Sequence, residues 1–318
     1  MLSFRRYSLL VLAYNLIVIL WGVFLRASRS GDGCGQHWLT CHGEIIPSAP
    51  ELKTLIEFSH RVTSAIAFLL VLGLLIWAFR KYDKGNAIRR TSLGAFVFII
   101  TEALIGAGLV LTGNTAENLT PTRPLWMAGH LLNTFILIAF LTLTVWLAYG
   151  REMFSLKVET KFIVMILIAI FGILFISITG SIAALSNLIF PSESIAEGIA
   201  KDFSSTSHLL VRLRVSHPIA SILVSVYLIF FADLLKNAKP SEVVSFWAKS
   251  LSILIIAQLV SGAITLLTLS PILMQVMHLL LADLVWINFL LLVISFLEKE
   301  NLSRTQKTTT ETITVFKP

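Results

Sequence analysis

Residues 56–79 read IEFSHRVTSAIAFLLVLGLLIWAF, and residues 214–232 read RVSHPIASILVSVYLIFFA. Each stretch places a histidine a few residues before an uncharged apolar run that is long enough, as a helix, to cross the hydrocarbon core of a bilayer. His217 follows His60 by 157 residues, so the second stretch repeats the first. Together they predict a membrane protein built from a duplicated helical unit.

The composition supports this prediction over the whole chain. Of 318 residues, 56% are hydrophobic and 14% charged, and the mean hydropathy of +0.84 excludes an ordinary soluble domain. We expect an all-α polytopic membrane protein with eight transmembrane helices. They are expected at 8–25, 59–79, 92–112, 125–148, 161–184, 208–232, 246–269 and 272–297.

The first apolar segment could instead be a cleavable signal peptide, because Arg5 and Arg6 precede it. The apolar run, however, continues through Trp21 to Phe24 without a small-residue cleavage site of the A-x-A kind. We therefore expect a retained first span.

The net charge of +7 reports topology and gives no sign of nucleic-acid binding. Lys and Arg concentrate in alternate connections, which the positive-inside rule places in the cytoplasm. The opposite loops hold fewer Lys and Arg, and both termini are therefore expected inside a cell membrane. The basic connections hold Arg5, Arg6, Arg80, Lys81, Lys84, Arg89, Arg90, Arg151, Lys157, Lys161, Lys236, Lys239, Lys249, Lys299, Arg304 and Lys307, and the opposite loops hold Asp32, Glu44, Glu51, Glu117, Glu193, Glu197 and Asp202.

Two further pairs of segments extend the internal repeat. Gly22 in LWGVFLRAS corresponds to Gly180 in SITGSIAAL, and TEALIGAGLVLTGN at 101–114 corresponds to AQLVSGAITLLTLS at 257–270. An even number of spans per repeat gives both units the same orientation. We expect two tandem four-helix bundles, 1–150 and 151–300, related by a pseudo-two-fold axis along the membrane normal, and a polar cytoplasmic tail at 301–318.

Four histidines are the main candidates for a functional site: His60, His130, His217 and His278. Each lies near the outer end of an even-numbered expected span, where ionisable groups are rare and usually functional. Two imidazoles on facing helices of an apolar bundle suit a haem iron, which predicts one haem site per half. For any one histidine the alternative is a core residue satisfied by a serine or a carbonyl; the symmetric placement of four favours ligation.

Both cysteines lie in the first outer loop, within GDGCGQHWLTCHG. Because the outer face of the membrane is oxidising, we expect a disulfide between Cys34 and Cys41. A metal pair with His37 or His42 lacks a recognised zinc spacing, and covalent haem attachment would need C-x-x-C-H. Those two histidines and His208 have no repeat partner and are expected at the surface.

Glu57 and Arg214 break the symmetry, because each lies three residues before the second-helix histidine of its half. On a helix this spacing puts the carboxylate on the same face as His60, where it could relay protons. The alternative is an interfacial glutamate at the helix start. Arg214 would more naturally pair with haem propionates. We therefore expect the first half to be reactive and the second to hold an auxiliary haem.

The paired-cysteine loop, the IEFSHR segment, the LIGAGLVLTG stretch and a later H-L at the fourth span resemble haem A synthases over residues 8–297. The resemblance implies an eight-helix oxidoreductase that converts the C8 methyl of haem O to the formyl of haem A for terminal oxidases. It also implies that His60 and His130 flank substrate haem O, that His217 and His278 ligate haem b, and that Glu57 is catalytic.

The resemblance further implies a Cys34–Cys41 disulfide, partnership with haem O synthase and with assembly factors of a terminal oxidase, and leaves a homo-oligomer open. Arg61 is a candidate for binding propionates. The family usually has H-R at the second-half histidine, whereas Pro218 follows His217 here. The proline is expected to kink that helix and to pass the propionate role to Arg212 or Arg214. A second cysteine pair, present in many relatives, is missing from residues 186–207.

Two other functions share the four histidines. A bis-histidine cytochrome b would transfer electrons without modifying haem, and a haem-binding chaperone or transporter would carry out no chemistry. Neither has a particular need for Glu57 or for the cysteine loop.

Overall fold

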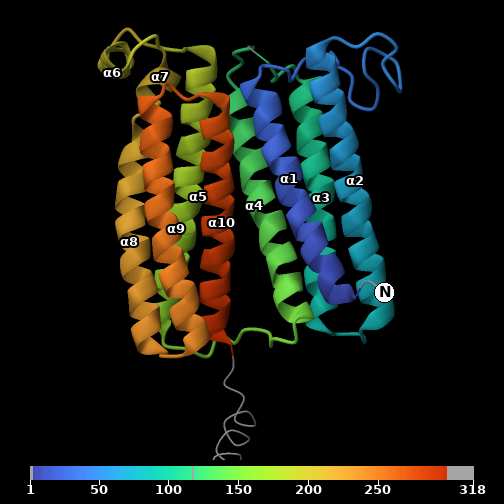
Figure 1. Ribbon diagram of the computed structural model, residues 1–318, viewed down its shortest axis with the longest axis vertical. Coiled ribbons are helices and arrows are strands. Elements are labelled where there is room, and N and C mark those ends of the chain that lie inside the picture. The colour runs from blue at the N-terminus through green and yellow to red at the C-terminus, as the bar shows by residue number, and fades with distance from the viewer. Residues whose placement is uncertain (1–2, 117, 299–318) are drawn as a thin grey trace, which may run out of the picture.

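The computed structural model describes residues 3–116 and 118–298 of the chain, which form a bundle of long, nearly parallel helices (Figure 1). Eight helices in this part of the chain are long and apolar enough to cross a membrane, and the prediction of an all-α, multi-pass membrane protein is confirmed. Glu117, Lys299 and the predicted tail at 301–318 lie outside the described residues.

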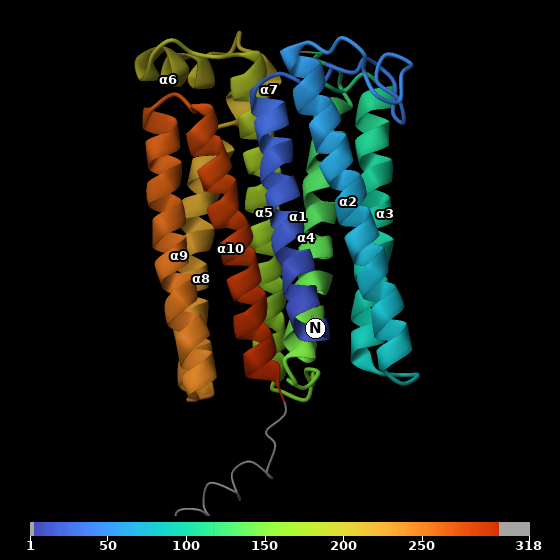
Figure 2. The ribbon, with the colours of Figure 1, turned by 45° about the vertical axis from the view of Figure 1, so that its right-hand side comes forward.

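The first four spans are α1 (Phe4–Ala27), α2 (Leu52–Lys81), α3 (Ala87–Leu111) and α4 (Arg123–Ala148). The second group consists of α5 (Thr160–Ile189), α8 (Ser216–Ala238), α9 (Glu242–Leu267) and α10 (Ile272–Leu297). Figures 1 and 2 show the two groups side by side. Helix α1 begins and α10 ends at the same end of the bundle, as an even number of spans requires (Figure 1). The orientation of that end in a membrane stays a prediction.

Helices α1 and α4 of the first group contact α5 and α10 of the second: α4 packs against both, and α1 against α10. The α4 and α10 helices are the most buried of the eight spans. Trp286 of α10 donates an indole hydrogen bond to the Phe135 carbonyl of α4 at 2.8 Å, and the two rings stack with centroids 5.6 Å apart. Large apolar side chains such as Leu69, Phe171 and Val226 are exposed on the outer helices, as expected where lipid takes the place of a core.

The second span of the second half differs from its prediction as one helix over 208–232. It consists of a short helix, α7 (Leu209–Leu213), followed by α8, with a break three to four residues before Pro218. Proline cannot donate a backbone hydrogen bond and its ring crowds the carbonyl four residues back. The His217 N–H bonds the Arg214 carbonyl at 3.2 Å in a tighter turn. The expected kink is therefore present.

A further helix, α6 (Ile195–Phe203), lies in the third outer loop and was not predicted. Its first turn is capped by Ser194, whose side chain accepts from the Glu197 N–H at 3.2 Å, while Glu197 reaches back to the Glu193 N–H at 2.7 Å. This S-x-x-E capping pattern is visible in the sequence. Helix α2 also begins earlier than predicted, at Leu52, because its first two turns pack beneath the cysteine loop.

The hydrogen bond between Trp286 and Phe135 predicts how the two groups of helices depend on each other. We expect Trp286→Phe to lower the thermal unfolding temperature of the detergent-purified protein, since the loss of one buried hydrogen bond costs about 1 kcal/mol. Trp286→Ala should lower it further, because the stacked ring is lost as well. Trp247→Phe, on α9 away from α4, is the control. Equal stability of Trp286→Phe and the unaltered protein would contradict this role.

Candidate functional site

The cysteine loop joins α1 to α2 at the end of the first half that lies opposite the start of α1. Cys34 and Cys41 form a disulfide with a sulfur–sulfur distance of 2.04 Å, as predicted. The ring is closed further by a hydrogen bond from the His42 N–H to the Cys34 carbonyl at 3.1 Å. The His42 side chain lies 2.9 Å from the Gly33 carbonyl and is part of the loop's own structure.

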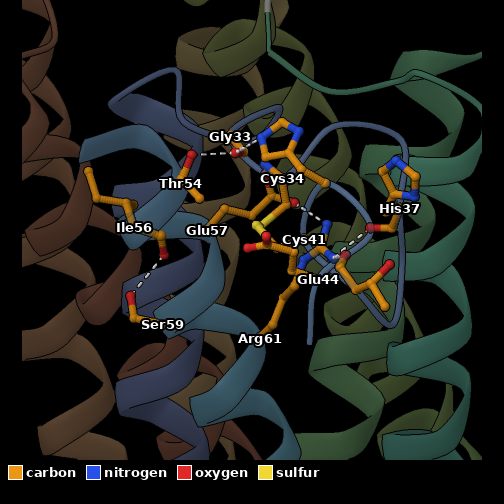
Figure 3. The surroundings of a disulfide bond; sticks show 12 residues. Gly33, Cys34, His37, Cys41, Glu44, Thr54, Ile56, Glu57, Ser59 and Arg61 are labelled. Carbon is orange, nitrogen blue, oxygen red and sulfur yellow. Dashed lines mark hydrogen bonds and ion pairs between the residues drawn. A yellow bond between two sulfur atoms is a disulfide. The ribbon is translucent and has the colours of Figure 1, made fainter. Parts of the chain in front are cut away.

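The first turns of α2 hold this loop from below (Figure 3). Thr54 donates to the Gly33 carbonyl at 2.6 Å, and the Glu57 carboxylate accepts from the Cys34 N–H at 2.8 Å. A Cβ at Gly33 would lie 2.4 Å from the Lys53 carbonyl carbon, so only glycine allows the loop to approach the helix this closely.

Arg61 completes the attachment of the loop. Its guanidinium donates to the carbonyls of His37, Trp38 and Thr40, at 2.5, 3.0 and 2.8 Å, and to the Glu57 carboxylate (Figure 3). Glu57 is 2% exposed, and each of its oxygens has a partner. The structure therefore brings Cys34, Cys41, Glu57 and Arg61 into one cluster, in which Glu57 and Arg61 anchor the loop. Contact between Arg61 and a propionate stays a prediction.

The second half fixes its outer loop with the opposite arrangement of charge. Arg214, which takes the place of Glu57 in the repeat, pairs with Asp202 at the end of α6. Its other nitrogens donate to the Asn187 side chain and the Gly198 carbonyl, both at 3.0 Å. Arg214 thus holds the α6 loop. Pro218 stands at the position that corresponds to Arg61 of the first half. Arg212 is exposed.

His208, predicted at the surface, has a local structural role. Its side chain caps α7 by accepting from the Leu210 N–H at 3.2 Å, and its ring stacks on Phe190 with a centroid separation of 5.1 Å.

Each second-helix histidine lies against a glycine of the first helix in its half. A Cβ on Gly22 would be 3.1 Å from the Cε1 atom of His60, and a Cβ on Gly180 would be 3.0 Å from that of His217. The repeat in the sequence is thus matched by the same contact in both groups of helices. Glycine is needed there because any side chain would displace the imidazole.

The histidines of the second half come together as a pair. The rings of His217 and His278 lie with centroids 6.3 Å apart and planes at 89°. Imidazole–metal bonds are about 2 Å long, so a metal held between two such rings separates their centroids by about 6 Å. In the first half, His60 and His130 lie on the corresponding helices α2 and α4, and their pairing stays a prediction.

Each of these rings has a nitrogen that no protein group satisfies. The Nδ1 atoms of His60 and His278 are buried without a hydrogen-bond partner, while the His130 Nδ1 atom lies 3.4 Å from the Glu102 carboxylate, which leaves its Nε2 atom for a ligand. The His217 Nδ1 atom lies 3.1 Å from the Ile176 carbonyl, which leaves its Nε2 atom for a ligand. Buried nitrogens without partners are costly unless a ligand uses them, so these four histidines would suit a haem iron as ligands. The described residues contain no cluster of three or more His, Cys, Asp or Glu side chains that could hold a bare metal ion.

Two acidic residues inside membrane spans were not predicted as site residues. Glu102 of α3 lies 3.4 Å from the Nδ1 atom of His130. Asp283 of α10 is fully buried, and no described residue bonds either of its oxygens. A charged residue in the middle of an apolar span is itself a signal of function, and that signal was available in the sequence.

Comparison with known proteins places this geometry in a family. The model of the family described as Cytochrome oxidase assembly protein matches residues 5–290. A protein of Thermus thermophilus named Protoheme IX farnesyltransferase is 42% identical over 91% of this chain, which spans 48% of that relative's length. A Heme A synthase of Bacillus cereus (strain G9842) is 26% identical over 83% of both chains, and one of Symbiobacterium thermophilum is 34% identical over 48% of this chain and 47% of its own length.

The Arg61 contacts predict that the loop loosens when its guanidinium is replaced. We expect Arg61→Lys to raise amide hydrogen exchange across residues 33–44, because one ammonium group cannot reach three carbonyls and a carboxylate together. Hydrogen exchange followed by mass spectrometry measures this. Arg212→Lys, at the exposed position on the other half, is the control. Unchanged protection in Arg61→Lys would show that the disulfide alone fixes the loop.

Proposed function

Because the chain belongs to the cytochrome oxidase assembly protein family, we propose that it is a haem A synthase, a membrane oxidoreductase that oxidises the C8 methyl of haem O to the formyl of haem A. The observation that carries this proposal is the pair of neighbouring rings of His217 and His278, together with the same glycine contact at His60 and His217 in the two halves. The Thermus relatives are about twice as long as the region matched here, so their named activity need not reside in it.

We assign the second half to a resident haem b. The facing rings of His217 and His278 have the separation that two axial ligands require. When bound, haem b supplies a redox centre for electron transfer. Gly180 and the Ile176 carbonyl fix the position and tautomer of His217, while the apolar helices around it exclude water.

We assign the first half to substrate haem O, held between His60 and His130. The disulfide loop covers the outer end of this half, and Glu57 lies at its base, one turn before His60 (Figure 3). In this proposal the Glu57 carboxylate is the proton-accepting group beside the bound substrate. Arg61 and the Cys34 N–H hold its carboxylate in position for that role.

The three arginines that are candidates for binding haem propionates differ in the groups that they already contact. Arg61 and Arg214 are engaged with the outer loops, whereas Arg212 is exposed at the surface. A propionate at Arg61 or Arg214 would have to share the guanidinium with loop groups. We therefore retain all three as candidates and place them at the outer end of the bundle.

The proposed partners follow from the chemistry of the substrate. Haem O has to be supplied by farnesyl transfer to protohaem, which is the activity that the Thermus relatives' name describes. Haem A would pass to a terminal oxidase during assembly. We place both termini in the cytoplasm, on the basis of the charges of the connecting loops. A homo-oligomer is compatible with the many apolar side chains on the outside of the bundle.

The test of this function is pigment extraction from cells that make haem O and carry this chain but no other haem A synthase. A haem A synthase yields formylated haem. A cytochrome b, or a chaperone without chemistry, yields bound pigment with no formyl product. Farnesylated haem made from protohaem in cells without a haem O source would instead assign to this chain the activity named for the Thermus relatives.

The role proposed for Glu57 predicts a specific loss. We expect Glu57→Gln to leave the haem content of the purified protein similar and to suppress formylated haem by about 100-fold, the scale on which positioned acid–base groups contribute. Pigment extraction and haem quantification measure the two quantities together. Glu44→Gln, within the same loop, is the control. Full conversion by Glu57→Gln would remove this carboxylate from the reaction.

The haem b assignment predicts a spectroscopic loss. We expect His217→Ala and His278→Ala each to abolish the low-spin b-haem absorbance of the purified protein, since each removes one axial ligand. His208→Ala, which removes the cap of α7 and the ring stacked on Phe190, should retain it. Unaltered spectra in the first two variants would overturn this cofactor assignment.

A further inference from the structure

The third helix of each half presents a polar side chain to the fourth-helix histidine of the same half. Glu102 of α3 and Gln258 of α9 are separated by 156 residues, as are Gly106 and Gly262 one turn later. The Glu102 Oε1 atom lies 3.4 Å from the His130 Nδ1 atom, and the Gln258 Nε2 atom lies 3.3 Å from the His278 Nε2 atom. The same place in the repeat therefore contacts the histidine in both halves, with a carboxylate in one and a neutral amide in the other.

The Glu102 carboxylate is held by side chains of α4, one turn beyond His130. The Asn133 amide donates to its Oε2 atom at 2.5 Å, and the Thr134 hydroxyl donates to its Oε1 atom. Thr101 in turn donates to the Asn133 side chain at 2.5 Å. A carboxylate inside a membrane span is costly unless it is compensated in this way. The network fixes the oxygen that faces His130.

The second half lacks this network. The residues that correspond to Asn133 and Thr134, 148 positions later as His278 is to His130, are Leu281 and Ala282. The residue that corresponds to Thr101 is Ala257. The Oε1 atom of Gln258 is buried without a hydrogen-bond partner among the described residues. The polar set of the first half is thus replaced as a group, which argues against chance placement of Glu102.

The space around the two histidines differs as well. A Cβ on Gly262 would lie 3.0 Å from the His278 Cε1 atom, whereas a Cβ on Gly106 would have no neighbouring atom within 4 Å. The His130 side chain is 35% exposed. Because the His130 ring is packed less tightly than the His278 ring, its orientation depends more on the Glu102 carboxylate.

We propose that Glu102 is the positioning residue of His130: its carboxylate accepts a hydrogen bond from the Nδ1–H of the ring and directs the Nε2 atom toward the iron of a haem in the first half. A carboxylate behind a ligating histidine strengthens the metal bond, and its loss typically costs 10–100-fold in affinity. The neutral Gln258 gives no such strengthening to His278. The two haem sites are therefore chemically distinct, because the fourth-helix histidine faces a glutamate in the first half and a glutamine in the second. This inference rests on the haem sites of the proposed function.

The test is titration of the full-length, haem-depleted protein in detergent with protohaem, followed by optical redox titration of the bound pigment. We expect Glu102→Gln to weaken the first-half site by about 10-fold or more and to raise its midpoint potential, with the second-half site unchanged. Glu102→Asp should restore part of the affinity and of the potential. Gln258→Glu should lower the potential of the second-half pigment, and Glu242→Gln, an exposed glutamate of α9, is the matched control.

Thr134→Val provides a milder variant that keeps the carboxylate and removes one of its donors. It should shift the first-half potential in the same direction as Glu102→Gln by a smaller amount. Unchanged affinity and potential in both Glu102→Gln and Thr134→Val would overturn the proposal, as would equal losses in Glu102→Gln and Glu102→Asp. If these shifts occur in a protein that makes no formylated haem, the role of Glu102 is supported and the proposed haem A synthase activity is contradicted. If formylated haem is made and the shifts do not occur, the activity is supported and the role of Glu102 is contradicted.

Discussion

The structure depends on how imidazoles are accommodated inside apolar helix bundles. A ring nitrogen without a partner is costly to bury in a membrane, and His60 and His278 each bury one. The neighbouring helices nevertheless approach the histidines closely, since Gly22, Gly180 and Gly262 allow the backbone to lie against His60, His217 and His278. A chain that only needed to span the bilayer would gain nothing from this arrangement. The cost is offset if an iron occupies the free nitrogens.

The two halves share this framework and differ in the polar groups built around it. In the first half, the second helix uses Glu57 and Arg61 to hold a disulfide loop; in the second half, Arg214 holds the α6 loop through Asp202. The third helices differ in the same way, with a carboxylate facing one fourth-helix histidine and an amide facing the other. The second-helix histidine of each half lies against a glycine of the first helix, whereas the polar neighbours of the fourth-helix histidines differ between the halves. Such inequality is what separate substrate and cofactor sites require.

The sequence predicted most of the fold, because long apolar runs have only one stable form across a bilayer. The eight spans, the disulfide and the break before Pro218 were all expected and are present. Helix α6 was missed because hydropathy does not report a short helix lying outside the membrane, although its S-x-x-E cap was readable. Glu102 is readable in the sequence as an ionisable residue within an apolar span, but its contact with His130 depends on how α3 packs against α4, which the sequence pattern does not specify. The Arg61 contacts depend on loop geometry, which no spacing rule supplies. The division into two domains and the pseudo-two-fold axis remain predictions.

The central claim is that four histidines act as two pairs, each holding one porphyrin near the outer end of its own half. The most direct measurement is an electron cryo-microscopy structure of the full-length protein purified with its native pigments. The account predicts porphyrin density between His60 and His130 or between His217 and His278, with ring nitrogens of both histidines directed at the iron. Porphyrin bound elsewhere, or these imidazoles turned outward into lipid, would contradict it.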